Sequence, residues 1–158
     1  MSRNFSFETE VGRLVWKLLL EAKRVRENAY APYSNYLVGC AIFGNNNRIY
    51  SGCNVECADY DGTHAEEAAL SAMVSSGERH PLMFVVVGGL RDAEDLSAAP
   101  PCGKCRQKLH EFSSLNGDEM KFIDLVDADS FRLVNISKLL PRSFGPANIG
   151  VDLAKYRR

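Results

Sequence analysis

Residues 82–89 read LMFVVVGG, a continuous apolar run that two glycines close. A strand that is apolar at every position is typical of a sheet whose two faces are both covered. Helical patterns lie on either side of this run, over residues 63–74 and 102–113. Strands that alternate with helices predict an α/β domain rather than an all-α or all-β one.

The rest of the chain extends this alternation. Apolar residues recur at helical spacing over residues 7–28. Four more strands are predicted, two of them joined by a turn at residues 44–47, and they cover residues 37–43, 48–53, 121–126 and 131–135. A helical turn over residues 137–140 and one short helix within 142–158 complete the pattern. The order predicts one three-layer α/β/α domain over residues 1–158, with a five-stranded mixed sheet between helical layers.

Composition and charge indicate which classes of binding partner the protein is expected to lack. The chain has 158 residues, of which 46% are hydrophobic and 25% are charged, close to the globular average. Its net charge is −1, so it lacks the basic excess typical of proteins that bind nucleic acids. The longest apolar run is too short to cross a bilayer. We therefore expect neither a polynucleotide nor a membrane as a partner.

Five cysteines indicate a metal or a catalytic role. Their number is odd, and the first residues show no signal-peptide pattern, which favours a reducing, cytoplasmic location. In that compartment, clustered cysteines more often bind a metal or act in catalysis than form disulfides.

Two motifs stand at predicted helix starts, Thr63-His64-Ala65-Glu66 and Pro101-Cys102-Gly103-Lys104-Cys105. Cysteines at positions i and i+3 of a first turn can place both sulfurs on one side of the helix. The free N–H groups at a helix start favour the thiolate form. His64 supplies a third ligand, and three ligands leave one position open, as in a catalytic zinc site. The predicted ligands of one Zn²⁺ are therefore His64, Cys102 and Cys105.

Glu66 is the predicted catalytic residue. It follows His64 by two residues and is near enough to exchange a proton with a water on the metal. The joint spacing His-x-Glu and Pro-Cys-x-x-Cys matches the known signature of zinc deaminases.

From the sequence alone, each of these residues could have another role instead. His64 could be a surface or capping residue, and Thr63 with Glu66 also fits a capping box. Cys102 and Cys105 could form a redox pair. A closed, structural zinc site would need a fourth ligand, for which the candidates are Cys53, Cys57, His80 and His110.

Over most of its length the chain resembles the cytidine deaminase family. Five segments match in the family's order: residues 29–39, residues 51–56, the two zinc segments, and residues 139–146. The resemblance implies a cytidine-deaminase-like fold, one Zn²⁺ per subunit, a small nucleoside substrate and a homotetramer. It also implies a set of substrate-binding residues, some of them reaching a neighbouring subunit's pocket: Tyr36, Asn54, Glu56, Ala58, Tyr60, Ala65, Pro100 and Phe144.

At the zinc site the chain departs in two positions from the short-chain branch that it resembles, and further departures are Cys57, Asp59 and Pro100. That branch usually has Cys and Arg where this chain has His64 and Glu67. The two changes are compatible, because one imidazole and two thiolates leave the zinc site neutral and no arginine is needed.

The resemblance implies hydrolytic deamination of cytidine, deoxycytidine or both. A blasticidin-type deaminase of an antibiotic nucleoside is an alternative, although that branch lacks the ribose-reading carboxylate present here as Glu56. A polynucleotide-editing deaminase and a non-catalytic, zinc-stabilised binding module are further alternatives.

Overall fold

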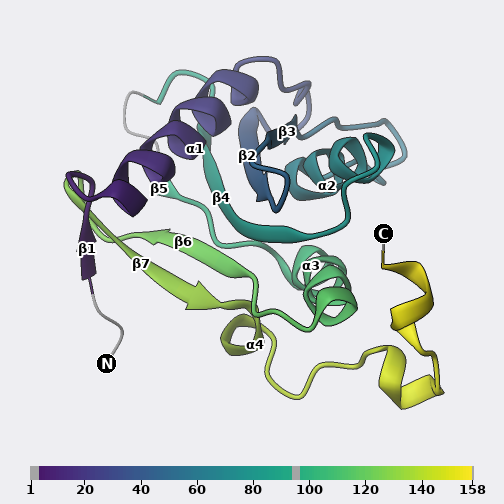
Figure 1. Ribbon diagram of the computed structural model, residues 1–158. Helices are drawn as coiled ribbons and strands as arrows, with labels where there is room; N and C mark the ends of the chain where they lie inside the picture. Colours follow the sequence, from purple (N-terminus) through teal and green to yellow (C-terminus); the bar gives the residue numbers. More distant parts are fainter. Residues whose placement is uncertain (1–3, 94–96, 158) are drawn as a thin grey trace.

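The computed structural model of the protein describes residues 4–93 and 97–157. Figure 1 shows a central sheet with α1 on one side and with α2 and α3 on the other. In chain order the elements are β1 (Asn4–Ser6), α1 (Glu10–Arg26), β2 (Tyr36–Gly44), β3 (Ile49–Cys53), α2 (Ala65–Ser75), β4 (Pro81–Leu90), β5 (Ser97–Ala98), α3 (Gly103–Asn116), β6 (Lys121–Leu125), β7 (Ser130–Asn135), α4 (Ile136–Leu139), and the 3₁₀ turns η1 (Pro146–Ile149) and η2 (Leu153–Tyr156).

The sheet is mixed, as predicted. In the described part of the chain it has seven strands in the order β1-β7-β6-β4-β2-β3, and β5 pairs with β4 off this path. Only the β4–β6 pair among these is parallel. The five predicted strands correspond to β2, β3, β4, β6 and β7. The additional strands β1 and β5 have three and two residues, too few to show a periodic pattern.

Strand β4 separates two apolar cores, which explains why its sequence is apolar throughout. Phe84 and Val86 pack with residues of α2 and α3. Val85 and Val87 point to the opposite face and pack with residues of α1. Successive strand side chains alternate between faces, so a strand covered by helices on both sides must be apolar at every position.

Capping residues set the helix boundaries, which differ from the predicted boundaries. Helix α1 is shorter than residues 7–28, because the Thr9 hydroxyl accepts a hydrogen bond from the backbone N–H of Gly12 at 2.9 Å and starts the helix there. His64 and Cys102 are the N-cap residues of α2 and α3. The tail after residue 142 forms two short 3₁₀ turns and not the single helix predicted.

Helix α2 lies unusually close to strand β3. A Cβ atom at Gly52 would lie 2.4 Å from the backbone nitrogen of Ala69, so only glycine permits this approach. This packing fixes α2, and with it the N-cap residue His64, against the sheet. None of the helices within residues 4–93 and 97–157 is both long and apolar enough to cross a membrane.

Candidate metal centre and active site

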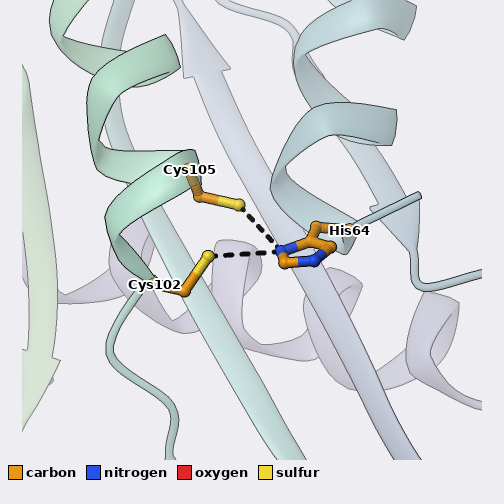
Figure 2. Close-up of side chains that lie close together, drawn as sticks. All are labelled: His64, Cys102 and Cys105. Carbon is orange, nitrogen blue, oxygen red and sulfur yellow. Dashed lines mark hydrogen bonds between the residues drawn. The ribbon is translucent and has the colours of Figure 1, made fainter. Parts of the chain in front are cut away.

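The starts of α2 and α3 bring the three predicted metal ligands together. Figure 2 shows the imidazole of His64 facing the sulfurs of Cys102 and Cys105. The His64 Nδ1 atom lies 3.3 Å from each Sγ atom. His64 and Cys102 have extended N-cap backbones, which turn their side chains toward each other from the two helix ends. Cys105 follows in the first turn of α3 and is fully buried.

The geometry and chemistry of this triad fit Zn²⁺. All three donor atoms lie within 4.8 Å of one another. For Zn–N near 2.0 Å and Zn–S near 2.3 Å at a tetrahedral angle, the nitrogen and sulfur atoms are expected to be about 3.5 Å apart. The observed 3.3 Å is close to that value. One nitrogen and two sulfur donors also match the ligand preference of zinc.

The triad has three members and not four. Among the described residues, the metal-ligand group contains none of the candidate fourth ligands Cys53, Cys57, His80 and His110. The imidazole of His80 instead lies 2.8 Å from the Asp118 carboxylate, and that of His110 lies 2.9 Å from the Ser143 hydroxyl. An open fourth position is characteristic of a catalytic rather than a structural zinc site.

Glu66 is buried in the first turn of α2, with 5% of its surface exposed. Burial raises the pKa of its carboxyl group, and hydrogen bonding to its own backbone N–H and then to the Cys105 thiol lowers the pKa in part. Burial also raises the pKa of the Cys105 thiol, and the neighbouring Glu66 carboxylate raises it further. Two buried acidic groups side by side are ionised together only when a cation offsets their charge. A cation held by the triad would offset that charge.

The helix cap of α2 belongs to Glu67, so the capping-box interpretation of Thr63 and Glu66 is wrong. His64, not Thr63, is the N-cap residue, which puts Glu67 at the third helical position. The Glu67 carboxylate accepts a hydrogen bond from the His64 backbone N–H at 2.9 Å. Glu66 is therefore not the capping-box residue of α2.

The second oxygen of Glu67 faces two lysines of α3. Lys108 donates a hydrogen bond to it, and the Nζ atom of Lys104 lies 3.4 Å away. Burial raises the pKa of Glu67, but the hydrogen bonds from Lys108 and from the His64 backbone outweigh that effect and lower it to about 2. Glu67 is therefore a carboxylate at any physiological pH.

A pocket of about 370 Å³ opens beside the triad. A volume of this size is typical of sites for small ligands. Of the predicted substrate residues, the structure places four there, namely Tyr36, Asn54, Ala65 and Pro100. The complete lining consists of those four with Val38, His64, Glu66, Val86, Ala99 and Cys102.

Three lining residues escaped the sequence analysis: Val38, Val86 and Ala99. A signal for Val38 was available, because it lies two residues after Tyr36 on β2 and so shares its face of the sheet. Val86 lies on β4, next to β2, where the pairing register places it opposite Cys40. That register is set by tertiary structure.

The Asn54 side chain is held rigidly at the edge of this pocket. Its Oδ1 atom accepts a hydrogen bond from the Val38 N–H at 2.8 Å, and its Nδ2 atom donates to the Tyr36 carbonyl at 2.9 Å. A primary amide has a second N–H and a second lone pair. Asn54 can therefore bind a further polar group in a fixed orientation.

Glu56 lies in a neighbouring pocket of about 250 Å³, which Tyr33, Ser34 and Tyr60 also line. Its carboxylate accepts hydrogen bonds from the Ser34 hydroxyl and from the backbone N–H groups of Tyr33 and Ser34, at 2.9 and 3.2 Å for the two N–H groups. The Ser34 hydroxyl and then these N–H groups lower the pKa of Glu56.

Two other predicted substrate residues also lie outside the pocket in this single chain. Ala58 is exposed on the same segment as Glu56. Phe144 is 60% exposed, and its carbonyl accepts a hydrogen bond from Gln107 at 2.8 Å. The structure thus places four of the predicted residues in the pocket at the triad and two, Glu56 and Tyr60, in a second pocket. Ala58 and Phe144 line neither of these two pockets.

Comparison with known proteins agrees with this site. The family model described as the cytidine and deoxycytidylate deaminase zinc-binding region matches residues 15–116, which include the whole triad. The chain is 36% identical over 136 residues to a cytidine deaminase of Sporosarcina psychrophila, covering 85% of this chain and 94% of that one. It is also 36% identical over 145 residues to a cytidine deaminase of Mycobacterium tuberculosis, covering 90% and 96% of the two chains.

Solved structures show the same fold. The crystal structure of a cytidine deaminase from Burkholderia pseudomallei superimposes with a TM-score of 0.69 at 34% identity, covering 82% of this chain and 98% of that one. A crystal structure of the Mycobacterium tuberculosis cytidine deaminase also gives a TM-score of 0.69, at 30% identity. These matches confirm the predicted fold, and with the triad they identify the metal as zinc. The chain belongs to the cytidine deaminase family.

Proposed function

We propose that this protein hydrolytically deaminates cytidine, deoxycytidine or both, releasing ammonia and the corresponding uracil nucleoside. The observation that carries the proposal is the buried carboxylate of Glu66, which lines the same pocket as His64 and Cys102. A zinc triad alone could be structural. A buried acid next to an open metal position is the arrangement that hydrolytic proton transfer requires.

Glu66 carries the protons in the proposed reaction. Zn²⁺, when held by His64, Cys102 and Cys105, would supply a Lewis acid that makes a water molecule acidic near neutral pH. Glu66 takes a proton from that water and delivers it to N3 of the cytosine ring, which makes C4 more electrophilic. The water oxygen forms a bond to C4, and Glu66 transfers the second proton of the water to the exocyclic amine. The C4–N bond then breaks, and ammonia leaves. Burial suits Glu66 to this role, because it raises the pKa and lets the carboxyl group hold a proton.

Pocket residues near the triad would bind the nucleoside. Tyr36, Val38 and Val86 offer an aromatic ring and two apolar side chains to a planar base. The fixed amide of Asn54 suits a ribose hydroxyl, which both donates and accepts. The Pro100 carbonyl is available to the leaving amine, since proline keeps this acceptor.

Glu56 would bind the ribose as well. Its two oxygens have about four acceptor positions, and donors from Tyr33 and Ser34 occupy three of them. One position is left for a substrate hydroxyl.

A homotetramer accounts for the residues that lie outside the pocket. Tyr60 is 86% exposed in the single chain, and Ala58 and Phe144 are exposed too. We propose that Ala58 and Tyr60 complete the pocket of a neighbouring subunit, as the family resemblance implies, and that Phe144 adds an aromatic wall. A cytoplasmic location belongs to the same proposal, because the zinc ligands Cys102 and Cys105 must stay reduced.

The test is a zinc assay combined with a turnover panel. Purified protein is analysed for bound zinc and then mixed separately with cytidine, deoxycytidine, CMP and blasticidin, while ultraviolet absorbance follows the loss of the amine. We expect about one zinc per chain and turnover of cytidine or deoxycytidine. Turnover of the antibiotic alone would support the blasticidin-type alternative. Full zinc occupancy with no turnover of any compound would support a non-catalytic binding module.

A further inference from the structure

The Glu67 carboxylate connects the two helix starts that carry the zinc ligands. One of its oxygens accepts a hydrogen bond from the backbone N–H of His64, which is itself a ligand. The other oxygen is paired with Lys108 and Lys104, which lie on the same helix as Cys102 and Cys105. A single side chain thus bridges the backbone of one ligand to the helix that supplies the other two.

Lys104 and Lys108 would each lower the stability of helix α3 if the helix had no neighbours. Lys104 stands in the first turn, where the positive end of the helix dipole disfavours a cation, and this turn has no acidic residue. Lys104 and Lys108 are also separated by four positions, and like charges at that spacing destabilise a helix. Both destabilising effects involve the lysines that contact Glu67. Such a conflict between local preference and structure is typical of a functional site.

Burial of the Glu67 carboxylate strengthens its interaction with Lys104 and Lys108. The Glu67 side chain is 10% exposed, whereas those of Lys104 and Lys108 are 47% and 49% exposed. The lysines are therefore partly screened by water, but the carboxylate that they share is not. A buried carboxylate with two cations and a backbone donor holds a fixed position better than an exposed ion pair does.

We infer that Glu67, Lys104 and Lys108 form a clamp that holds the starts of α2 and α3 at the spacing that the zinc ion requires. The three are positioning residues, because they act on the ligands and do not touch the metal. The clamp keeps the His64 imidazole opposite the two sulfurs, and its loss lets the first turn of α2 move away from α3. This inference rests on the zinc site and not on the proposed deamination, so its test measures the metal.

Zinc release tests the clamp. Zinc-loaded wild type, Glu67→Gln, Lys108→Met and the double variant are mixed with a chromogenic chelator, and the rate of zinc transfer is recorded. We expect release about tenfold faster in each single variant, the usual scale for losing a group that orients a metal ligand. Because both changes break the same interaction, the double variant should release zinc no faster than Glu67→Gln. Lys108→Arg, which keeps the cation, should release zinc at nearly the wild-type rate.

A second readout separates positioning from general stability. Cobalt(II) replaces zinc in each variant, and the visible absorption bands report the ligand geometry. Glu67→Gln and Lys108→Met should shift these bands, whereas Asp124→Asn, which breaks the Asp124–Arg132 ion pair between β6 and β7, should not. Unchanged cobalt bands and zinc-release rates in Lys108→Met would overturn the inference, even if its melting temperature fell. Lys108→Met decides the outcome if Glu67→Gln does not fold.

Discussion

The Nδ1 atom of His64 lies 3.3 Å from the Sγ atom of Cys105, although 41 positions separate the two residues in the chain. Each stands at the start of a different helix, and the two helices pack on the same face of the sheet. Zinc binding therefore joins two helices that packing on the sheet and the Glu67 ion pairs already bring near each other. Metal and fold are coupled at this contact.

Removal of zinc should abolish activity and weaken the contact between α2 and α3. Without the cation, the ligand bonds that join the starts of α2 and α3 are lost. We expect a metal-free sample, prepared with a chelator at neutral pH, to melt at a lower temperature and to recover on addition of one equivalent of Zn²⁺. Calorimetry with and without zinc checks this. Equal melting temperatures would show that the ion contributes nothing to the fold.

Glu66→Gln should retain zinc and substrate binding but lose turnover. Glutamine has nearly the same shape but cannot carry the proton, and general acid–base catalysis typically contributes about 10²–10⁴-fold in rate. The measurement is kcat for cytidine together with zinc content. Glu10→Gln, an exposed change in the first turn of α1, serves as the control and should turn over at the wild-type rate. Near-normal kcat in zinc-loaded Glu66→Gln would contradict the mechanism.

Asn54→Ala should raise KM and lower stability together. The change removes the hydrogen bonds to the Val38 N–H and the Tyr36 carbonyl, at a cost of about 1–3 kcal/mol in unfolding free energy. Asn46→Ala is a matched control, because Asn46 also makes two side-chain hydrogen bonds, to Tyr50 and Arg48, but far from the pocket. Kinetics and urea denaturation of both variants distinguish the roles. If the two variants lose stability equally and neither changes KM, Asn54 is structural only.

The titration of Glu56 should report the contact between its carboxylate and the 33–34 turn. Because the Ser34 hydroxyl and the two N–H donors lower its pKa below 4.5, its stabilising effect is fully present above pH 4.5 and is lost as the pH falls through the lower folded-state value. Carboxyl-carbon NMR of labelled protein measures that value directly. Ser34→Ala removes the leading cause and should raise the pKa of Glu56 toward 4.5. An identical titration in both proteins would show that the hydroxyl has no effect.

Arg26→Met should be among the more destabilising substitutions outside the site. The buried guanidinium donates hydrogen bonds to the carbonyls of Leu37, Gly89 and Leu90, at 3.2, 3.1 and 2.7 Å. Leaving such buried acceptors unpaired costs on the order of 3 kcal/mol. Arg24→Met is the control, since the Arg24 side chain in its ion pair with Glu21 is largely exposed and its loss should cost much less stability. Urea denaturation compares the two variants, and equal losses would contradict this account.

Local patterns in the sequence were sufficient for the metal ligands and most of the elements. The types and spacing of His64, Cys102 and Cys105 follow from ligand chemistry and helix geometry within one turn, so they were predicted correctly. The apolar run in β4 indicated burial on both faces, because successive side chains of a strand point to opposite faces of the sheet. The alternative capping box of Thr63 and Glu66 is wrong by one residue, because the start of a helix depends on backbone angles that composition does not specify.

The amino-acid sequence by itself determined the family, the zinc chemistry and the alternation of helices with strands, since each is recognised from motifs or periodic patterns within short segments. Tertiary structure alone decided that Glu67 meets Lys104 and Lys108 and that Glu56 lies apart from the zinc pocket. It also decided that Val86 faces that pocket. The reason is physical: a charged or apolar side chain has no fixed partner until sheet register and helix packing bring distant segments into contact.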